Sequence, residues 1–233
     1  ILVTPGTIHS VVENMTLNYN ALAGVMLLDA DNGRRGNTVR NSTFTNNGET
    51  GLKLISGTEG AVIENNTFSS NSTSILLQDA HNNLVQGNSI SGIVLDPLLD
   101  ADAGIVLELG SRDNTLIDND IADTGDAGVV IHQGSHRNTV SGGELLRNGD
   151  AGVIVNDSNA TEIFDITAMH ASDGGVVLNN AHNTKIQGSD LRFNPSGVEA
   201  GNTNGLILGG PPVDGVCVDG NDASYSLQTG FEL

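Results

Sequence analysis

The chain has 233 residues, with 9 Lys and Arg against 28 Asp and Glu, and carries a formal net charge of −19. A surface this acidic repels nucleic-acid phosphates and anionic lipid head groups, so we expect no nucleic-acid partner. No apolar run reaches the roughly 18 residues of a membrane span, and no basic leader precedes an apolar segment, so we expect no membrane insertion.

Two interpretations of the acidity stay open: a surface adapted to high salt, where charge repulsion is screened, or an ordinary acidic secreted protein. The single cysteine, Cys217 in "GVCVDG", predicts a small buried hydrophobic side chain and no disulfide.

A glycine or small residue followed by alternating aliphatic residues recurs every 23 to 30 residues. These first phrases begin at Gly24, Gly51, Ser74, Gly104, Gly128, Gly152, Gly175, Gly205 and Gly230. Between them runs a second phrase, an aliphatic residue followed two positions later by Asn, Asp or Gly, as in "IENNTF" from Ile63 and "LIDNDI" from Leu116. Each unit therefore holds two or three short strands, separated by corners that tolerate left-handed backbone.

Stacked units of this kind pair every strand with the turns above and below it, which predicts an all-β fold, a parallel β-helix solenoid of about nine turns. We expect one domain over residues 1–233. Because both ends stop in the middle of the pattern, at "ILV" and "GFEL", we expect a segment of a longer chain. The second-phrase corner residues are expected to form an axial ladder, in which side-chain amides bond along the stack: Asn41, Asn65, Gly87, Asp118, Gly142, Gly188 and Gly220.

The alternation of "NNTF"- or "GNSI"-type phrases with "GIVL"-type phrases resembles the right-handed parallel β-helix repeat of pectate-lyase-like proteins. It is similar to the repeats of mannuronan epimerases and of the periplasmic β-helix accessory proteins of copper-enzyme maturation. The resemblance covers nearly the whole chain and implies a right-handed solenoid. It does not choose among lyases, hydrolases, epimerases, adhesins and spacers, all of which use this scaffold.

The catalytic signatures of these families are absent. Alginate epimerases carry an Asp-Pro-His-Glu motif, but here Asp96 and Pro97 are followed by Leu98 and Leu99. The Asn-Thr-Asp, Asp-Asp and Gly-His-Asp segments of polygalacturonases have no counterpart either.

Basic residues recur at the corner four positions before the second phrase, where the repeat predicts an axial stripe. This stripe comprises Arg35, Glu59, His81, Arg112, His136, Asn159, His182 and Asp214. A second polar stripe follows the first-phrase strand at Gln78, Glu108, His132, Asn156 and Asn179. The candidate binding residues are Arg35, His81, Arg112, His132, His136 and His182. Three interpretations stay open: a groove for an anionic polysaccharide, a histidine metal site that lacks a third ligand of comparable quality, or a solvated corner.

If the protein is an enzyme, a lyase or C5-epimerase acting on an anionic glycan, the weak catalytic candidates are Asp102, Arg112 and His136. No cofactor is required by the sequence, although the acidic loop containing Asp96, Asp100 and Asp102 suits Ca²⁺.

The outward-facing position of the first phrase is unexpectedly apolar. We expect an interface, either with a protein partner or by self-association, at Met26, Leu76, Val106, Val130, Ile154, Val177 and Ile207. Two longer loops, residues 91–104 and 192–205, are expected beside it. Together with six sequons, these features favour an extracellular or cell-surface glycoprotein with a structural or adhesive role and polysaccharide contact.

Overall fold

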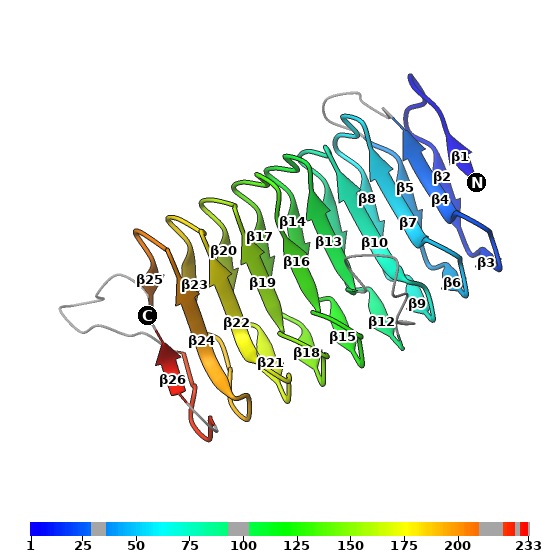
Figure 1. Cartoon of the computed structure of the whole chain (residues 1–233). Helices are drawn as coiled ribbons and strands as arrows, with labels where there is room; N and C mark the ends of the chain where they lie inside the picture. The colour runs from blue at the N-terminus through cyan, green and yellow to red at the C-terminus, as the bar shows by residue number, and fades with distance from the viewer. Residues whose placement is uncertain (29–35, 93–102, 210–220, 227–228, 233) are drawn as a thin grey trace.

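The computed structural model describes residues 1–28, 36–92, 103–209, 221–226 and 229–232. In Figure 1 the chain winds into a rod in which the turns follow one another in sequence order from the N-terminus to the C-terminus. All strand pairs in the described chain are parallel, and the rod has three sheets. The predicted all-β parallel solenoid is thus confirmed.

Sheet A contains ten strands: β1 (Leu2–Val3), β4 (Ala23–Leu28), β7 (Thr50–Ile55), β10 (Thr73–Gln78), β13 (Ile105–Glu108), β16 (Val129–Ile131), β19 (Val153–Asn156), β22 (Gly174–Asn179), β24 (Ser196–Gly201) and β26 (Thr229–Glu232). Sheet B contains nine: β2 (Val11–Glu13), β5 (Thr38–Arg40), β8 (Val62–Glu64), β11 (Leu84–Gln86), β14 (Thr115–Ile117), β17 (Thr139–Ser141), β20 (Glu162–Phe164), β23 (Lys185–Gln187) and β25 (Ile207–Leu208). Sheet C contains seven: β3 (Thr16–Asn18), β6 (Thr43–Thr45), β9 (Thr67–Ser69), β12 (Ser89–Ser91), β15 (Asp120–Ala122), β18 (Glu144–Leu146) and β21 (Thr167–Met169). The nine stacked strands of sheet B agree with the expected number of turns.

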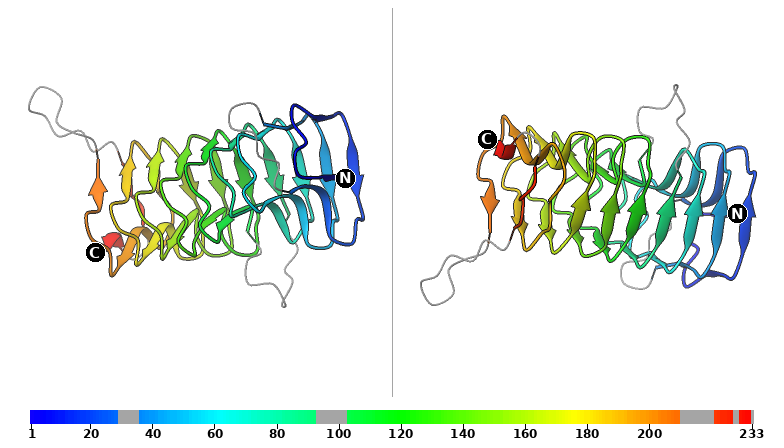
Figure 2. Two further views of the ribbon diagram at one scale, coloured as in Figure 1. Left: turned by 90° about the horizontal axis from the view of Figure 1, so that it is seen from above. Right: turned by 90° about the horizontal axis from the view of Figure 1, so that it is seen from below.

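Apart from the two-residue β25, the strands of sheets B and C are three residues long, and in most of them only the middle side chain points inward. These inward residues join the inward aliphatics of sheet A in one continuous core that runs from Val3 to Val198. Phe44 and Phe68 stack in it with ring centroids 4.6 Å apart. Figure 2 shows the three sheets enclosing this interior along the length of the rod. In sheets B and C, burial on the inner side therefore uses mostly one side chain per strand and leaves the outer side largely for polar residues.

The corners between the sheets contain one or two residues with left-handed backbone. Between sheets B and C these include Asn65, Gly87, Asp118 and Gly142, with φ between +50° and +62°. Asn, Asp and Gly tolerate this conformation best, so the recurrence of these residues in the second phrase reflects the turn itself.

The amide ladder lies one residue later than the sequence predicts. Asn41 and Asn65 are exposed, whereas the next positions, Ser42 and Asn66, are buried. Asn66 Nδ2 donates to Val39 O (2.9 Å) and to Asn88 Oδ1 (3.0 Å), and its Oδ1 accepts the backbone N–H of Ser42 (3.0 Å). The sequence does not reveal which residue forms the ladder, because two asparagines are consecutive here. Asn65 forms the bend on the outside of the rod, whereas Asn66 forms hydrogen bonds inside it.

Two further corners repeat this device. Asn83, Asn114 and Asn138 link successive turns between sheets A and B, through amide contacts of 3.0 and 3.1 Å. Asn20, Asn47 and Asn71 do so between sheets C and A. Buried amides thus pair the backbone groups that the bends remove from the sheets.

The register of the last turns corrects one predicted strand. Ile207 was expected on the outer face of the first-phrase stack, but it lies in β25 of sheet B and pairs with Lys185. The sheet A strand of this turn is β24, in which Glu199 takes the position that follows Val177. Residues 192–205 were expected to be a long loop and instead contain this strand. The pattern failed because Glu199 and Ala200 replace the aliphatics that mark the other copies.

Asn66→Ala is expected to lower the free energy of unfolding by about 3 kcal/mol, because it leaves several buried backbone groups without partners. Asn65→Gly, one residue earlier, is expected to change it by less than about 0.5 kcal/mol, because glycine fits the left-handed backbone there. Urea unfolding of both variants measures the contrast. Equal destabilisation would show that the ladder is not carried by the buried amide.

Candidate functional site

The predicted basic stripe forms a continuous line along the corner between sheets A and B. We call Glu59, His81, Arg112, His136, Asn159, His182 and Asn204 the corner column. Backbone bridges join Glu59 to His81, His81 to Arg112 and Asn159 to His182. Arg35 and Asp214 lie outside the described residues. From Glu59 to His182 the members stack as the repeat predicts, whereas ligand binding by them stays a prediction. Asn204 takes the place after His182 that the repeat assigns to Asp214, because β25 is the sheet B strand that follows β23.

Part of the corner column has a structural role. The backbone N–H of Asn159 donates to His136 Nδ1 (3.0 Å), and that of His182 donates to Asn159 Oδ1 (3.2 Å). The backbone N–H of Asn204 likewise donates to His182 Nδ1 (3.1 Å). A ring nitrogen that accepts a hydrogen bond carries no proton, so the proton of each neutral imidazole resides on Nε2. The corner therefore fixes the tautomer that leaves Nε2–H as a donor.

His81 and Arg112 do not continue this ladder. His81 Nε2 lies 3.3 Å from Asp79 Oδ1, and its Nδ1 is buried without a hydrogen bond. The Arg112 side chain is 47% exposed, and its nearest carboxylate among the described residues, Asp113, is 3.9 Å away. Its guanidinium is therefore open to solvent.

Asp113 is instead bound by the arginine of the next turn. Arg137 Nε and Nη2 each donate to an oxygen of Asp113 at 2.7 Å. The hydrogen bond from Arg137 lowers the pKa of Asp113 below its ordinary value, against an opposing effect of burial. Since Asp113 is held by Arg137, it neutralises Arg112 only weakly.

The second polar stripe also stacks as predicted. Gln78 Nε2 donates to Glu108 Oε1 (3.1 Å), and Glu108 Oε2 lies 3.3 Å from His132 Nε2. Asn179 Nδ2 donates to Asn156 Oδ1 (3.2 Å) further along the rod. His132 and His136 belong to the same turn, on either side of the left-handed Gln133 and Gly134. A carboxylate against an imidazole is an arrangement that can support proton transfer.

Within the described residues, no group of three or more His, Cys, Asp or Glu side chains could hold a metal ion. Asp96, Asp100 and Asp102, on which the Ca²⁺ expectation depends, lie outside the described residues, as does Cys217. Of the three catalytic candidates, Arg112 and His136 come together in adjacent turns, and Asp102 is not placed.

The outward aliphatic positions of sheet A are largely buried. Val106, Val130, Ile154 and Val177 are 1–7% exposed and pack with Ala103, Ala127 and Ala151 in a second cluster outside the solenoid core. Leu76 is partly buried against this cluster, and Met26 is half-buried. At the centre of this face little side-chain area remains accessible to a partner, and the expected interface stays a prediction.

An acidic row that sequence reasoning did not single out borders this cluster. Asp126, Asp150 and Asp173 immediately precede Ala127, Ala151 and Gly174, and backbone hydrogen bonds link them from turn to turn. Burial, followed by repulsion from Asp173, raises the pKa of Asp150 above its ordinary value. Each of these aspartates lies two residues before a first-phrase glycine, and this fixed spacing could have revealed the acidic row in the sequence.

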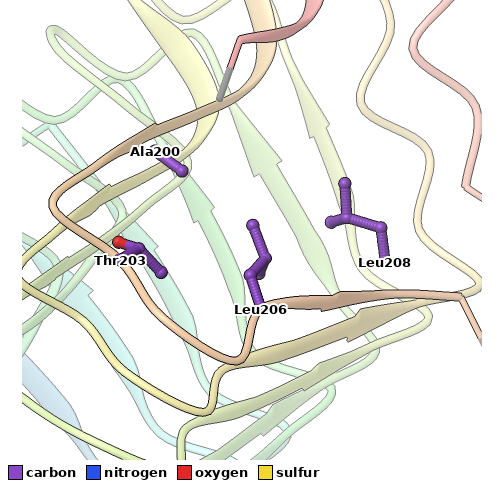
Figure 3. A pocket seen from close by; sticks show the side chains of 4 residues that line it. All are labelled: Ala200, Thr203, Leu206 and Leu208. Atoms are coloured by element: carbon purple, nitrogen blue, oxygen red, sulfur yellow. The ribbon is translucent and has the colours of Figure 1, made fainter.

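The cavity in Figure 3 lies at the C-terminal end of the rod. It has a volume of about 290 Å³ and is lined by Ala200, Thr203, Leu206 and Leu208. The Thr203 hydroxyl already donates to Gly201 O (3.1 Å). None of the described residues that line this cavity is titratable.

The right-handed β-helix region family model matches residues 1–167, so the chain belongs to the right-handed β-helix family. This confirms the resemblance seen in the repeats. A comparison with curated proteins finds no match. Within the described chain there is also no helix with the length and apolarity of a membrane span.

Several solved structures share the fold. A single mutant of the periplasmic alginate epimerase AlgG has a TM-score of 0.63 at 16% identity, over 79% of this chain and 47% of its own. An alginate lyase from Paenibacillus sp. str. FPU-7 has a TM-score of 0.58 at 13% identity, over 97% of this chain and 92% of its own. Tailspike protein 2 of the Escherichia coli O157:H7 bacteriophage CAB120 has a TM-score of 0.53 at 12% identity, over 88% of this chain and 34% of its own. The chain thus spans about half the length of the AlgG structure, and at these identities the likeness is one of fold.

Arg137→Gln is expected to raise the pKa of Asp113 toward its ordinary value near 3.8, because the hydrogen bond from Arg137 is lost. An Asp whose folded pKa is depressed stabilises the fold above its unfolded pKa, and this contribution disappears as pH falls through the folded value. The urea midpoint of the variant should therefore be lower than that of the parent at pH 7, and the difference should shrink as pH falls below 3.8 and through the folded pKa of Asp113. Carboxyl NMR titration gives the pKa directly, with Arg147→Gln as the control that should leave Asp113 unchanged.

Proposed function

We propose that this chain is an extracellular or cell-surface β-helix module that holds a polysaccharide along the corner column in a structural or adhesive role. The observation that carries the proposal is the line of N–H donors on the corner column, at the exposed guanidinium of Arg112 and at Nε2 of the half-buried His136 and His182, on an otherwise acidic rod. Such a line suits a ligand rich in oxygen acceptors.

The spacing of the column suits an extended chain. Successive turns lie about 4.8 Å apart, so the column is a row of side chains parallel to the rod axis. Arg112 presents a planar guanidinium that suits carboxylate or sulfate groups on a sugar. The two histidines offer single donors whose rings are held by the corner ladder, which reduces the entropy lost on binding.

The comparisons support this proposal only in outline. Proteins with the same fold include an alginate epimerase, an alginate lyase and a bacteriophage tailspike. Two of these proteins are named for a polysaccharide, alginate, and the third is named as a bacteriophage tailspike. These names agree with glycan contact outside the cytoplasm. The high net negative charge and the sequons are consistent with the same location.

One observation favours a second function, that of a lyase or C5-epimerase on an anionic glycan. Glu108 Oε2 lies 3.3 Å from His132 Nε2, in the same two turns as Arg112 and His136. A positioned imidazole can abstract a proton from a sugar carbon, while a guanidinium stabilises the charge that develops. Asp102 and a Ca²⁺ ion held by its loop are proposed participants in this case only.

Proton NMR of anionic polysaccharides incubated with the protein separates the two functions. Alginate, polygalacturonate and glycosaminoglycans are tested with and without Ca²⁺, at low and high salt. A holding module leaves every spectrum unchanged while binding at least one polymer. New olefinic, reducing-end or epimer signals would instead establish the enzyme.

Arg112→Gln is expected to weaken polysaccharide binding about tenfold, because it removes the open cation of the column. Arg147→Gln is the matched control, because it removes the same charge from an arginine that already donates two hydrogen bonds to Asp123, at 2.8 and 2.9 Å. This variant should change Kd less than about twofold. His136→Asn keeps an acceptor for the ladder, as Asn159 does in the next turn, but loses the imidazole donor. Equal weakening by Arg112→Gln and Arg147→Gln would reduce the effect to net charge and contradict the proposed site.

Association along the outer face of sheet A stays part of the proposal at its accessible positions, Met26 and Leu76. Leu76→Ser is expected to convert a self-associated form to monomer in sedimentation velocity, because it places a hydroxyl in the contact. Lys53→Ser, at the position between them, is the control on the same face. A parent protein that sediments as a monomer at every concentration would remove self-association from the proposal.

A further inference from the structure

The fold treats the six sequons of the chain differently. The acceptor residues of these Asn-x-Ser/Thr motifs are Asn14, Asn41, Asn65, Asn71, Asn156 and Asn159. An enzyme that glycosylates such a motif must reach both the asparagine amide and the hydroxyl group two residues later, because it joins the sugar to the first and recognises the second. Accessibility of both groups therefore separates usable motifs from those that arise by chance in a chain rich in asparagine.

Three of the motifs are closed by the fold. Asn71 is 0% exposed, and its amide belongs to the buried ladder between sheets C and A. In the motifs that begin at Asn156 and Asn159, the hydroxyl residues Ser158 and Thr161 are also 0% exposed. None of these three motifs offers both groups in the folded chain.

The other three motifs lie in successive turns at one corner of the rod, between sheets B and C. Asn41 and Asn65 are exposed, and their hydroxyl residues, Thr43 and Thr67, are half-buried and exposed, respectively. The residue between asparagine and threonine is buried in both motifs, so the amide and the hydroxyl group share the outer side. Both motifs have described turns on either side, so their exposure does not depend on the ends of the chain. Asn14 takes the equivalent place in the first turn.

The corner itself does not require asparagine. Asn41 and Asn65 have left-handed backbone, with φ of +50° and +54°, but glycine takes the same place in a later turn, at Gly87. Asn41 Nδ2 donates to Glu13 Oε1 across 3.4 Å, and within the described chain no hydrogen bond involves the Asn65 side chain. Folding thus leaves the Asn65 amide available for a reaction.

We propose that Asn65, and to a lesser extent Asn41, are sites of N-linked glycosylation. This inference rests on the extracellular location in the proposed function, because this modification is made on exported chains. The co-reactant is an oligosaccharide whose anomeric carbon is activated by a lipid-linked phosphate or diphosphate. The asparagine Nδ2 forms a bond to this carbon while the bond from the carbon to the phosphate oxygen breaks. The phosphate leaves with the electron pair, and the amide gives up one proton to the transferase.

Asn65 is the favoured acceptor because it has more room. Successive turns are about 4.8 Å apart, so a bulky glycan on one corner residue crowds the residues above and below it. Asn41 lies between Asn14 and Asn65 and is bonded to Glu13, whereas Asn65 has Gly87, which lacks a side chain, on one side. We expect most chains to carry a glycan at Asn65 and few to carry glycans at both Asn41 and Asn65.

Glycopeptide mass spectrometry of the protein from the cells that produce it tests the proposal. Trypsin releases residues 41–53, and chymotrypsin cleaves after Phe68, between Asn65 and Asn71. We expect a glycan on the Asn65 peptide in most molecules and none on the Asn71 peptide. Protein recovered outside the cell with Asn41 and Asn65 unmodified would overturn this inference and leave the proposed function in place. Recovery from the cytoplasm alone would contradict both.

Variants at this corner show whether the exposed motif selects the site. Thr67→Ala should remove the Asn65 glycan, whereas Thr67→Ser keeps the hydroxyl group and should retain it. In the Thr67→Ala background, Gly87→Asn creates the same motif one turn further along, with the exposed Ser89 as its hydroxyl residue, and should restore one glycan. Asp118→Asn is the matched control, because it places asparagine at an equivalent corner with no hydroxyl residue two positions later.

All of these substituted positions are exposed, so the variants should fold like the parent. Persistence of the glycan in Thr67→Ala, failure of Gly87→Asn to gain one, or a glycan on the Asp118→Asn corner would each overturn the inference.

Discussion

Each turn of this solenoid must bend the chain out of its sheets three times without leaving backbone polar groups unpaired inside. The inward side chains of neighbouring turns touch, so water has no access to the bends. Buried amides solve the problem: Asn66, Asn88 and Asn119 pair in one corner, and Asn83, Asn114 and Asn138 in another. Because each amide bonds to the turns on both sides, this requirement sets the register of the sheets as well as the path of the corners.

The same constraint decides where chemistry can occur. The backbone groups of the strands are paired with the neighbouring strands, and the inward side chains are buried in the core. The corners project side chains in rows parallel to the axis, one residue per turn. At His136 and His182 the structural and functional interpretations of the corner column are compatible, since one ring nitrogen completes the ladder while the other remains a donor. A histidine here is therefore a ladder residue that can also contact a ligand.

The fold and the corner column were predictable because both depend on spacing. A glycine followed by aliphatics marks each sheet A strand, and residues at a fixed offset from it must stack. Prediction failed where the marker residues change. Glu199 and Ala200 conceal β24, so Ile207 was assigned to the wrong sheet. The ladder was displaced by one residue because Asn65 and Asn66 are chemically identical, and only the backbone determines which of them points inward. The stacked aromatic rings of His170, Phe193 and Tyr225, at the corner from sheet C to sheet A, were missed because this corner follows the third strand of each turn, which carries no strong repeat of its own.

The distribution of charge gives these corners different properties. Three of the few cationic side chains are each paired with a carboxylate through two hydrogen bonds. These pairs are Arg137–Asp113, Arg147–Asp123 and Arg192–Asp190. Such pairs on the surface stabilise the fold only modestly, but they remove both charges from the field that a ligand meets. Arg112 escapes this pairing because Asp113 is already held by Arg137. An anionic glycan that approaches the described part of the rod thus meets a mostly repulsive surface with one open guanidinium, and this contrast, rather than total charge, would align it with the corner column.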